Sequence, residues 1–175
     1  AQEIEDQSAV NVVVEKDSSK WAFEAFSKID FNDTSAKKIF FSGLGTTKST
    51  AGGIENQRKI DLDLNYDLAK KAKKLGYTTC VLVSSAGASS ESMFPYLKMK
   101  GELEDKLSEL EFDNLVILRP GALLGDRIKN IKGFGNNLAS YVCGKAYGTW
   151  FSKALGYPVY GDSVGEAGVE IAIKL

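Results

Sequence analysis

A tyrosine four residues before a lysine is the pattern in this sequence with the clearest chemistry. Tyr96 and Lys100 have this spacing, which on a helix places both side chains on the same face. The lysine ammonium can lower the pKa of the phenol from ~10 towards neutral pH, which would make the tyrosine a usable general acid or base. A nearby serine hydroxyl would hold a substrate carbonyl oxygen as its charge changes. Ser84 and Ser85, shortly upstream, are the candidates.

The spacing alone does not identify a site, because the chain is rich in lysine. Two other pairs share it, Tyr66/Lys70 and Tyr141/Lys145. Only Tyr96 and Lys100 follow a long apolar run that ends in Ser84-Ser85-Ala86-Gly87. Only this pair leads into an apolar stripe at helical spacing that would turn both side chains towards a sheet, formed by Leu103, Leu107 and Leu110. The context therefore favours Tyr96 and Lys100.

Composition excludes several classes of function. The 175 residues contain no histidine, which rules out Ser-His-Asp triads, Cys-His proteases and histidine-bound zinc. The two cysteines show no metal-ligand spacing, so no metal site is expected, and Cys80 reads as a small core residue. A net charge of −1 gives no indication of a nucleic-acid partner. No apolar run is long enough to span a bilayer.

The elements that must position Tyr96 and Lys100 alternate between strands and helices. Apolar runs predict strands at 10–15, 38–42, 78–84 and 115–118, with a short extended piece at 157–160. Helical periodicity predicts helices at 20–29, 54–75, 95–110, 137–155 and 164–174. This alternation predicts a single α/β domain over residues 1–175, with three layers and a mostly parallel sheet. Residues 1–9 are expected to be disordered, and residues 126–175 to form the substrate side.

Ligands of open α/β sheets bind outside the carboxyl ends of the strands. The loops at 43–47, 84–88 and 119–125 are therefore expected to line one cleft. The glycines of the first loop form neither a complete dinucleotide fingerprint nor a P-loop. Asp61 and Asp63 are predicted to lie on a solvated helix face, as are the lysines between positions 70 and 74.

Three segments together resemble the atypical short-chain dehydrogenases: the strand followed by Ser84 to Ala88, the stretch from Tyr96 to Glu102, and Arg119-Pro120-Gly121. In particular, they resemble a group that includes a Tat-interacting oxidoreductase-like protein of human and a mitochondrial outer-membrane protein of yeast. Gly45-Thr46-Thr47 and the segment from Tyr157 to Gly161 are similar to the same group. The resemblance covers nearly the whole chain.

The resemblance implies a Rossmann-like fold and an NAD(P)-linked oxidoreductase, with NADP as the cofactor and a carbonyl or alcohol as the substrate. It makes Tyr96 and Lys100 the catalytic pair and Ser85, or its neighbour Ser84, their hydroxyl partner. The residues it places against the cofactor are Gly45, Thr46, Thr47, Lys100, Pro120 and Gly121. It also implies a mitochondrial location, peripheral to the outer membrane; without it a cytoplasmic protein would be expected.

Two departures from the family keep a second function open. Many extended relatives have an asparagine where Asp61 stands, which affects the proton-relay part of their mechanism. The chain is also expected to lack the first βαβ unit, whose glycine-rich turn would hold the cofactor's pyrophosphate. The alternative is an inactive Rossmann-like scaffold, or a cofactor sensor, that binds a protein partner. Aromatic residues after position 125 suit an apolar substrate pocket and aromatic core packing about equally well, and homo-oligomer formation stays open.

Overall fold

The computed structural model describes residues 13–27, 37–124 and 159–175, and the chain divides into two compact units, residues 1–36 and 37–175. In the first unit, a 3-10 turn at Ser18–Lys20 leads into helix α1, Trp21–Ser27. The Asp17 carboxylate accepts the Ser19 amide at 3.1 Å and so caps the turn. The helix predicted at 20–29 is thus confirmed up to residue 27. Of the strand predicted at 10–15, residues 13–15 do not form a strand, and residues 10–12 lie outside the described residues.

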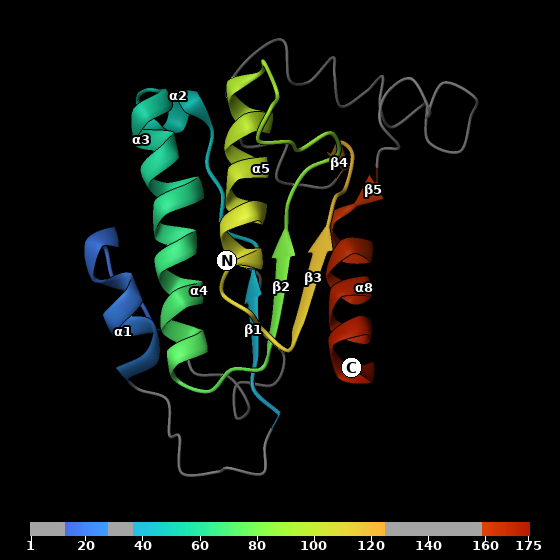
Figure 1. The fold of residues 1–175 in the computed structure, drawn as a ribbon. Coiled ribbons are helices and arrows are strands. Elements are labelled where there is room, and N and C mark those ends of the chain that lie inside the picture. The colour runs from blue at the N-terminus through green and yellow to red at the C-terminus, as the bar shows by residue number, and fades with distance from the viewer. Residues whose placement is uncertain (1–12, 28–36, 125–158) are drawn as a thin grey trace, which may run out of the picture. The chain divides into compact units, whose positions relative to one another are not determined.

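The second unit is organised around a parallel sheet of three strands in the order β1-β2-β3 (Figure 1). The strands are Ile39–Ser42, Thr79–Val83 and Asn114–Leu118. Ile39 pairs with Thr79, and Thr79 pairs with Asn114. Strand β2 is buried along almost its whole length, as its uninterrupted apolar sequence predicts for a central parallel strand.

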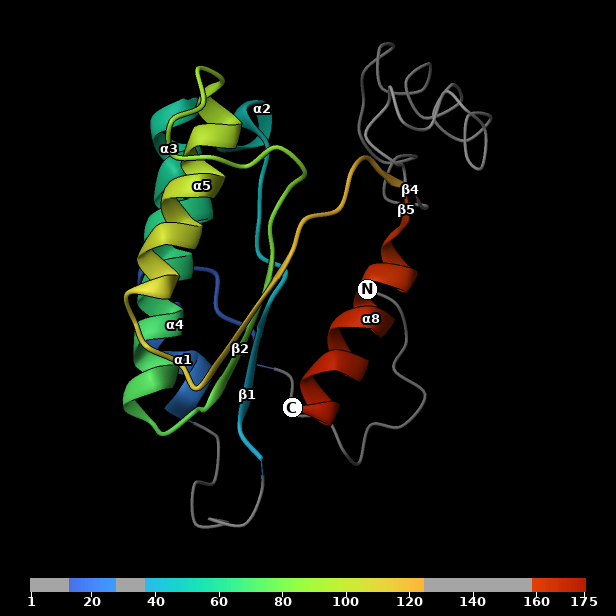
Figure 2. The same cartoon turned by 45° about the vertical axis from the view of Figure 1, so that its right-hand side comes forward.

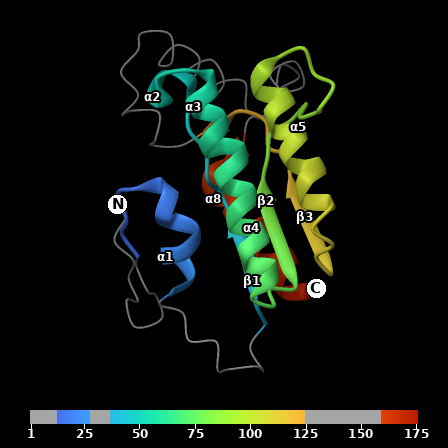
Figure 3. The same cartoon turned by 60° about the vertical axis from the view of Figure 1, so that its left-hand side comes forward.

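Helices cover both faces of this sheet, so the predicted three-layer α/β architecture is confirmed and is consistent with a Rossmann-like fold (Figure 2). One face carries α4, Asn65–Lys74, and α5, Pro95–Ser108, which lie side by side (Figure 3). The other face carries α8, Gly161–Lys174, which contacts β2 and β3. The predicted helix at 164–174 therefore begins three residues earlier, and the one predicted at 137–155 lies outside the described residues.

A second, small sheet follows β3 directly. Leu123–Leu124 forms β4 and pairs in parallel with β5, Val159–Tyr160. The extended piece predicted at 157–160 is confirmed over its last two residues. Strand β4 was not predicted, because a strand of two residues shortly after Pro120-Gly121 shows no periodicity.

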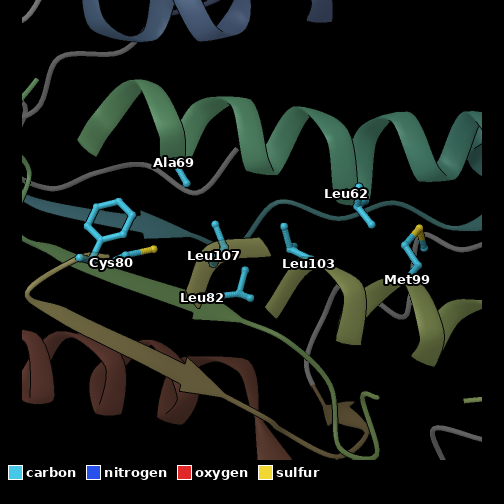
Figure 4. Packing of buried hydrophobic residues seen from close by; sticks show 8 residues of the cluster. Leu62, Ala69, Cys80, Leu82, Met99, Leu103 and Leu107 are labelled. Atoms are coloured by element: carbon cyan, nitrogen blue, oxygen red, sulfur yellow. The ribbon is translucent and has the colours of Figure 1, made fainter. Parts of the chain in front are cut away.

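The core lies between the sheet and the pair α4/α5 (Figure 4). Leu103 and Leu107 are almost completely buried there, which confirms that the stripe after Lys100 faces the sheet. They pack with Leu62 and Ala69 from the neighbouring helix and with Leu82 from β2. Burying a leucine side chain of this kind contributes about 1.5–3 kcal/mol.

Cys80 lies within this core, as predicted from its apolar surroundings. Burial raises the pKa of its thiol to about 12, so almost no thiolate exists at neutral pH. We expect Cys80 to resist iodoacetamide at pH 8 in the folded chain and to react at once in urea. A Cys143→Ser variant leaves Cys80 as the only thiol for mass spectrometry. Rapid labelling of the folded variant would contradict this placement.

Among the residues described, no helix combines the length and the apolar character needed to cross a membrane. Within the same residues, no group of three or more acidic, histidine or cysteine side chains could hold a metal ion.

Candidate functional site

The two candidate serines follow directly after β2 and have different environments. Ser84 is buried, and its hydroxyl donates a hydrogen bond to the carboxylate of Glu104 on α5. Ser85 is only partly buried; its hydroxyl donates to the Ala86 carbonyl at 3.4 Å and lies close enough to the Tyr96 phenol to lower the pKa of that phenol. Of the alternatives Ser84 and Ser85, only Ser85 has the geometry of a hydroxyl partner for Tyr96.

Lys100 lies one helical turn beyond Tyr96 and is 3% exposed. Its ammonium donates a long hydrogen bond, 3.5 Å, to the carbonyl oxygen of Val83, at the end of β2. Burial lowers the pKa of Lys100, while the negative charges of Asp61 and Glu104 raise it. Within the part of the chain that the structure describes, this bond uses one of the three donors of the ammonium, so Lys100 has capacity to bind a further acceptor.

The Tyr96 phenol is 40% exposed, at the point where α5 begins. Burial raises its pKa above the usual 10, the nearby Ser85 hydroxyl lowers it, and the charge of Asp61 raises it again. The net direction is upward, so the expected lowering by Lys100 is wrong for this structure. The physical reason is that the Lys100 ammonium points to Val83 and interacts with Asp61 and Glu104 instead.

The loop after β1 brings the residues from 43 to 47 to the same end of the sheet. A Cβ atom at Gly45 would lie 3.9 Å from the Asp61 carboxylate and 4.0 Å from the Lys100 ammonium, so Gly45 lies beside both. The Thr46 amide donates to Asp61 at 2.7 Å. The Thr47 hydroxyl accepts the Thr50 amide at 3.1 Å and caps the short helix α2, Lys48–Ala51. The Thr46 amide and the Thr47 hydroxyl thus stabilise the conformation of the loop.

Pro120 and Gly121 follow β3 and lie beside the serine-bearing loop. The Ala86 amide donates to the Pro120 carbonyl at 2.8 Å, which places Pro120 next to Ser85 in space. The three strand ends therefore meet as the parallel topology predicts, and the candidate residues from all three loops lie at one end of the sheet.

Asp61 is a site residue that the sequence reasoning missed. It was predicted to lie on a solvated helix face, yet it is 1% exposed, whereas Asp63 is exposed as predicted. The predicted helix at 54–75 contains α3, Ile54–Arg58, and then a π-helical segment, Lys59–Leu64, before α4. An α-helical wheel does not describe a π-helical stretch, so the face assigned to Asp61 was wrong. The signal in the sequence was the asparagine that stands at this position in many of the short-chain dehydrogenases that the chain resembles.

Hydrogen bonds hold the Asp61 carboxylate between the loop after β1 and α3. Besides the Thr46 amide, it accepts the Gln57 side-chain amide at 3.3 Å, and the same Gln57 amide donates to the Thr46 carbonyl at 2.9 Å. Burial raises the pKa of Asp61, and the Thr46 bond, the Lys100 charge and the Gln57 bond lower it, with a net upward shift. Asn65 supports the same loop by donating to the Leu44 carbonyl at 3.2 Å.

The competing tyrosine and lysine pairs do not form a comparable site within the described residues. Lys70 lies over the Tyr66 ring, 5.6 Å from its centroid, and Lys106 of α5 lies 5.0 Å from the same centroid. These are cation–π contacts, and the Tyr66 ring is partly buried against the edge of the core. The pair Tyr141/Lys145 and the aromatic residues after 125 lie outside the described residues.

Comparison with known proteins identifies the family. The family model described as HIM1 matches residues 11–149, which contain every candidate site residue. The chain belongs to the HIM1 family. Relatives include "Protein FMP52, mitochondrial" of Eremothecium gossypii, 46% identical over 94% of this chain and 70% of the relative. The protein of the same name from Saccharomyces cerevisiae is 47% identical over 94% of this chain and 69% of the relative.

The match to Kluyveromyces lactis "Protein FMP52, mitochondrial" is 52% identical but spans 77% of this chain and 60% of that protein. The HIM1-family relatives are thus longer than this chain.

In this HIM1-family chain, the raised pKa of Asp61 has a consequence for stability. An acid whose pKa is higher in the folded state than in the unfolded state makes the folded state lose stability as the pH rises through both values. We therefore expect the stability of the wild type, relative to Asp61→Asn, to fall as the pH rises from 4 to 7. Urea unfolding of both proteins across this range measures the difference. A relative stability that rises with pH would show that the folded chain lowers the pKa of Asp61.

Proposed function

We propose that this chain carries the catalytic half of an NADP-linked oxidoreductase of the atypical short-chain dehydrogenase type, acting on a carbonyl or alcohol substrate. The observation that carries the proposal is that Ser85, Tyr96 and Lys100 lie together at one end of the sheet. The Ser85 hydroxyl is close enough to the Tyr96 phenol to lower its pKa, and the buried Lys100 ammonium lies one helical turn further along α5, bonded to Val83 at the end of β2. A phenol, a hydroxyl and an ammonium at one end of a parallel sheet suit the handling of a substrate oxygen that gains or loses charge.

The residues present fit the sugar and nicotinamide end of NADP. Among the described residues, the buried Lys100 ammonium makes one long hydrogen bond, so its remaining donors suit the hydroxyl oxygens of a ribose. Gly45 has no side chain between the Asp61 carboxylate and the Lys100 ammonium, so a ligand can approach the backbone there. Thr46, Thr47, Pro120 and Gly121 would border this ligand from the two flanking loops. When bound, the nicotinamide would supply or accept the hydride.

In the proposed reduction, Tyr96 donates its phenolic proton to the carbonyl oxygen of the substrate as a hydride reaches the carbonyl carbon. Ser85 donates a hydrogen bond to the same oxygen and fixes its distance from the phenol. Lys100 stabilises the phenolate left on Tyr96 once its ammonium turns from Val83 towards the site. The products are the alcohol and the oxidised cofactor, and a proton from water restores Tyr96.

The raised pKa of Tyr96 supports one direction of this reaction. A phenol whose pKa lies above 10 is protonated at neutral pH, so it is ready to act as an acid. This state favours carbonyl reduction over alcohol oxidation, which needs the phenolate. Rates of reduction should therefore change little between pH 6 and 8, while any oxidation should rise with pH.

The names of the relatives support a mitochondrial location for this chain. We extend this to a peripheral position at the outer membrane, with a small molecule as the substrate. Fractionation of mitochondria followed by carbonate extraction tests this part. Release of the protein into the carbonate supernatant is expected, and its absence from the outer-membrane fraction would contradict it.

Fluorescence titration with NADPH tests the proposed function. Lys100→Met should weaken binding at least about tenfold, because it removes a charge-assisted hydrogen bond inside a buried site. Lys98→Met is the matched control, since Lys98 is exposed on the same helix, and it should bind NADPH as the wild type does. The titration is made with this chain and with a chain of the relatives' full length. Absence of NADPH binding in both would overturn the proposal.

A further inference from the structure

Glu104 is a buried carboxylate on α5 to which neither the sequence pattern nor the proposed reaction gives a role. It is 4% exposed. Its carboxylate accepts the Ser84 hydroxyl and both the Nε and Nη2 donors of Arg119, with 3.1 Å between Arg119 Nε and Glu104 Oε1. A buried carboxylate is costly unless it is paired, and a forked arginine contact fixes its orientation as well as its charge. Glu104 is therefore held in one geometry.

The two partners of Glu104 come from adjacent strand ends. Val83 pairs with Leu118 as the last position of the ladder, and Ser84 and Arg119 directly follow these two residues. Backbone bonds lie on either side, from the Ser84 amide to the Leu118 carbonyl at 2.7 Å and from the Ala86 amide to the Pro120 carbonyl at 2.8 Å. Glu104 thus attaches the joined ends of β2 and β3 to helix α5.

The same helix carries the proposed catalytic pair. Glu104 follows Lys100 by one turn and Tyr96 by two. Lys100 bonds Val83 and Glu104 bonds Ser84, so two successive turns of α5 are attached to successive residues of β2. Ser85 comes next in the chain, and its hydroxyl meets the phenol at the start of the helix.

Close packing restricts how far the helix can adjust. A Cβ atom at Gly101 would lie 2.1 Å from the Ser89 carbonyl carbon, so α5 touches the backbone of the loop that follows Ser85. The contact at Gly101 fixes α5 against this loop. The hydrogen bonds of Glu104 then determine where the ends of β2 and β3 lie relative to α5.

We propose that Glu104 is a positioning residue, which keeps the Ser85 hydroxyl beside the Tyr96 phenol by attaching Ser84 and Arg119 to α5. The catalytic meaning of this role rests on the proposed function; the geometric role does not. A residue that only stabilised the fold would leave the contact between Ser85 and Tyr96 unchanged in any variant that folds.

The test is a pH titration of tyrosine Cζ by NMR with ¹³C-labelled tyrosine, in which the Tyr96 signal is assigned from Tyr96→Phe. Ser85→Ala should raise the pKa of Tyr96, because the Ser85 hydroxyl lowers it. Glu104→Ala should raise the pKa of Tyr96 too, so that the acid dissociation constant of the phenol becomes roughly two- to tenfold smaller. In a chain that already carries Ser85→Ala, Glu104→Ala should change this pKa little further. Loss of the negative charge alone would act in the opposite direction, so the sign separates positioning from electrostatics.

Glu109→Gln is the control, since it removes an exposed carboxylate from the end of the same helix and should leave the titration unchanged. If Glu104→Ala does not fold, Glu104→Gln and Arg119→Lys replace it, because each keeps the side-chain volume but breaks the forked ion pair. An unchanged or lowered pKa of Tyr96 in the folded variants overturns the inference. The titration contains neither cofactor nor substrate, so failure of the proposed function would leave its result standing.

Discussion

Tyr96→Phe is expected to lower carbonyl-reducing turnover with NADPH by about 10²–10⁴-fold, the contribution typical of a general acid. The substitution removes only the hydroxyl that would protonate the substrate oxygen. The ring is 40% exposed at the start of α5, so the core does not depend on the lost oxygen. Circular dichroism and NADPH affinity should therefore match those of the wild type, and the loss should appear in kcat.

The chain contains a well-matched control for this substitution. Tyr66 also precedes a lysine by four residues, but its ring contacts the ammonium groups of Lys70 and Lys106 and packs against the core, away from Ser85 and Lys100 in the described site. Tyr66→Phe retains the ring and its cation–π contacts, so turnover should be unchanged. Equal turnover in the wild type and Tyr96→Phe would sink the assignment of Tyr96 as the acid.

Gly101→Ala is expected to destabilise the chain by at least about 3 kcal/mol, at or above the upper end of the usual cost of overpacking. The added Cβ would lie 2.1 Å from the Ser89 carbonyl carbon and 2.2 Å from the Ser90 amide nitrogen. Both are backbone atoms, which cannot rotate away as a side chain would. The loop after Ser85 or the helix must shift, and either movement separates α5 from the strand ends. Urea unfolding measures the loss.

Gly165→Ala controls for the intrinsic preference of a helix for alanine. Gly165 also lies within a helix, α8, but a Cβ atom there meets nothing within 4 Å. This substitution should therefore stabilise the chain by about 0.5–1 kcal/mol. A Gly101→Ala variant as stable as the wild type would contradict the close approach of α5 to residues 89 and 90.

The parallel sheet and the inward-facing side of the helix that carries Tyr96 and Lys100 were readable from the sequence because burial dictates local pattern. Strand β2 had to be apolar throughout, since helices cover both of its faces. Leu103 and Leu107 repeat at helical spacing because they enter the core, and their direction fixed the face of α5 on which Lys100 lies.

The environment of the site was not readable, because contacts between distant residues determine it. Asp61 reads as an ordinary exposed acid until the π-helical segment turns it towards Thr46 and Lys100. The pKa of Tyr96 depends on burial and on Asp61, neither of which is visible in the spacing of Tyr96 and Lys100. Likewise, the sequence does not distinguish Ser84 from Ser85; the difference arises because the Ser84 hydroxyl donates a hydrogen bond to the Glu104 carboxylate.

Transfer of a deuterium label tests the central claim most directly. NADPH deuterated at C4 of the nicotinamide is incubated with the protein and a panel of aldehydes and ketones, and the alcohols are analysed by mass spectrometry. The account predicts deuterium on the carbinol carbon of an alcohol formed by the wild type and by Tyr66→Phe, and almost none with Tyr96→Phe. Binding of NADPH without label in any product, or equal labelling by Tyr96→Phe, would contradict it.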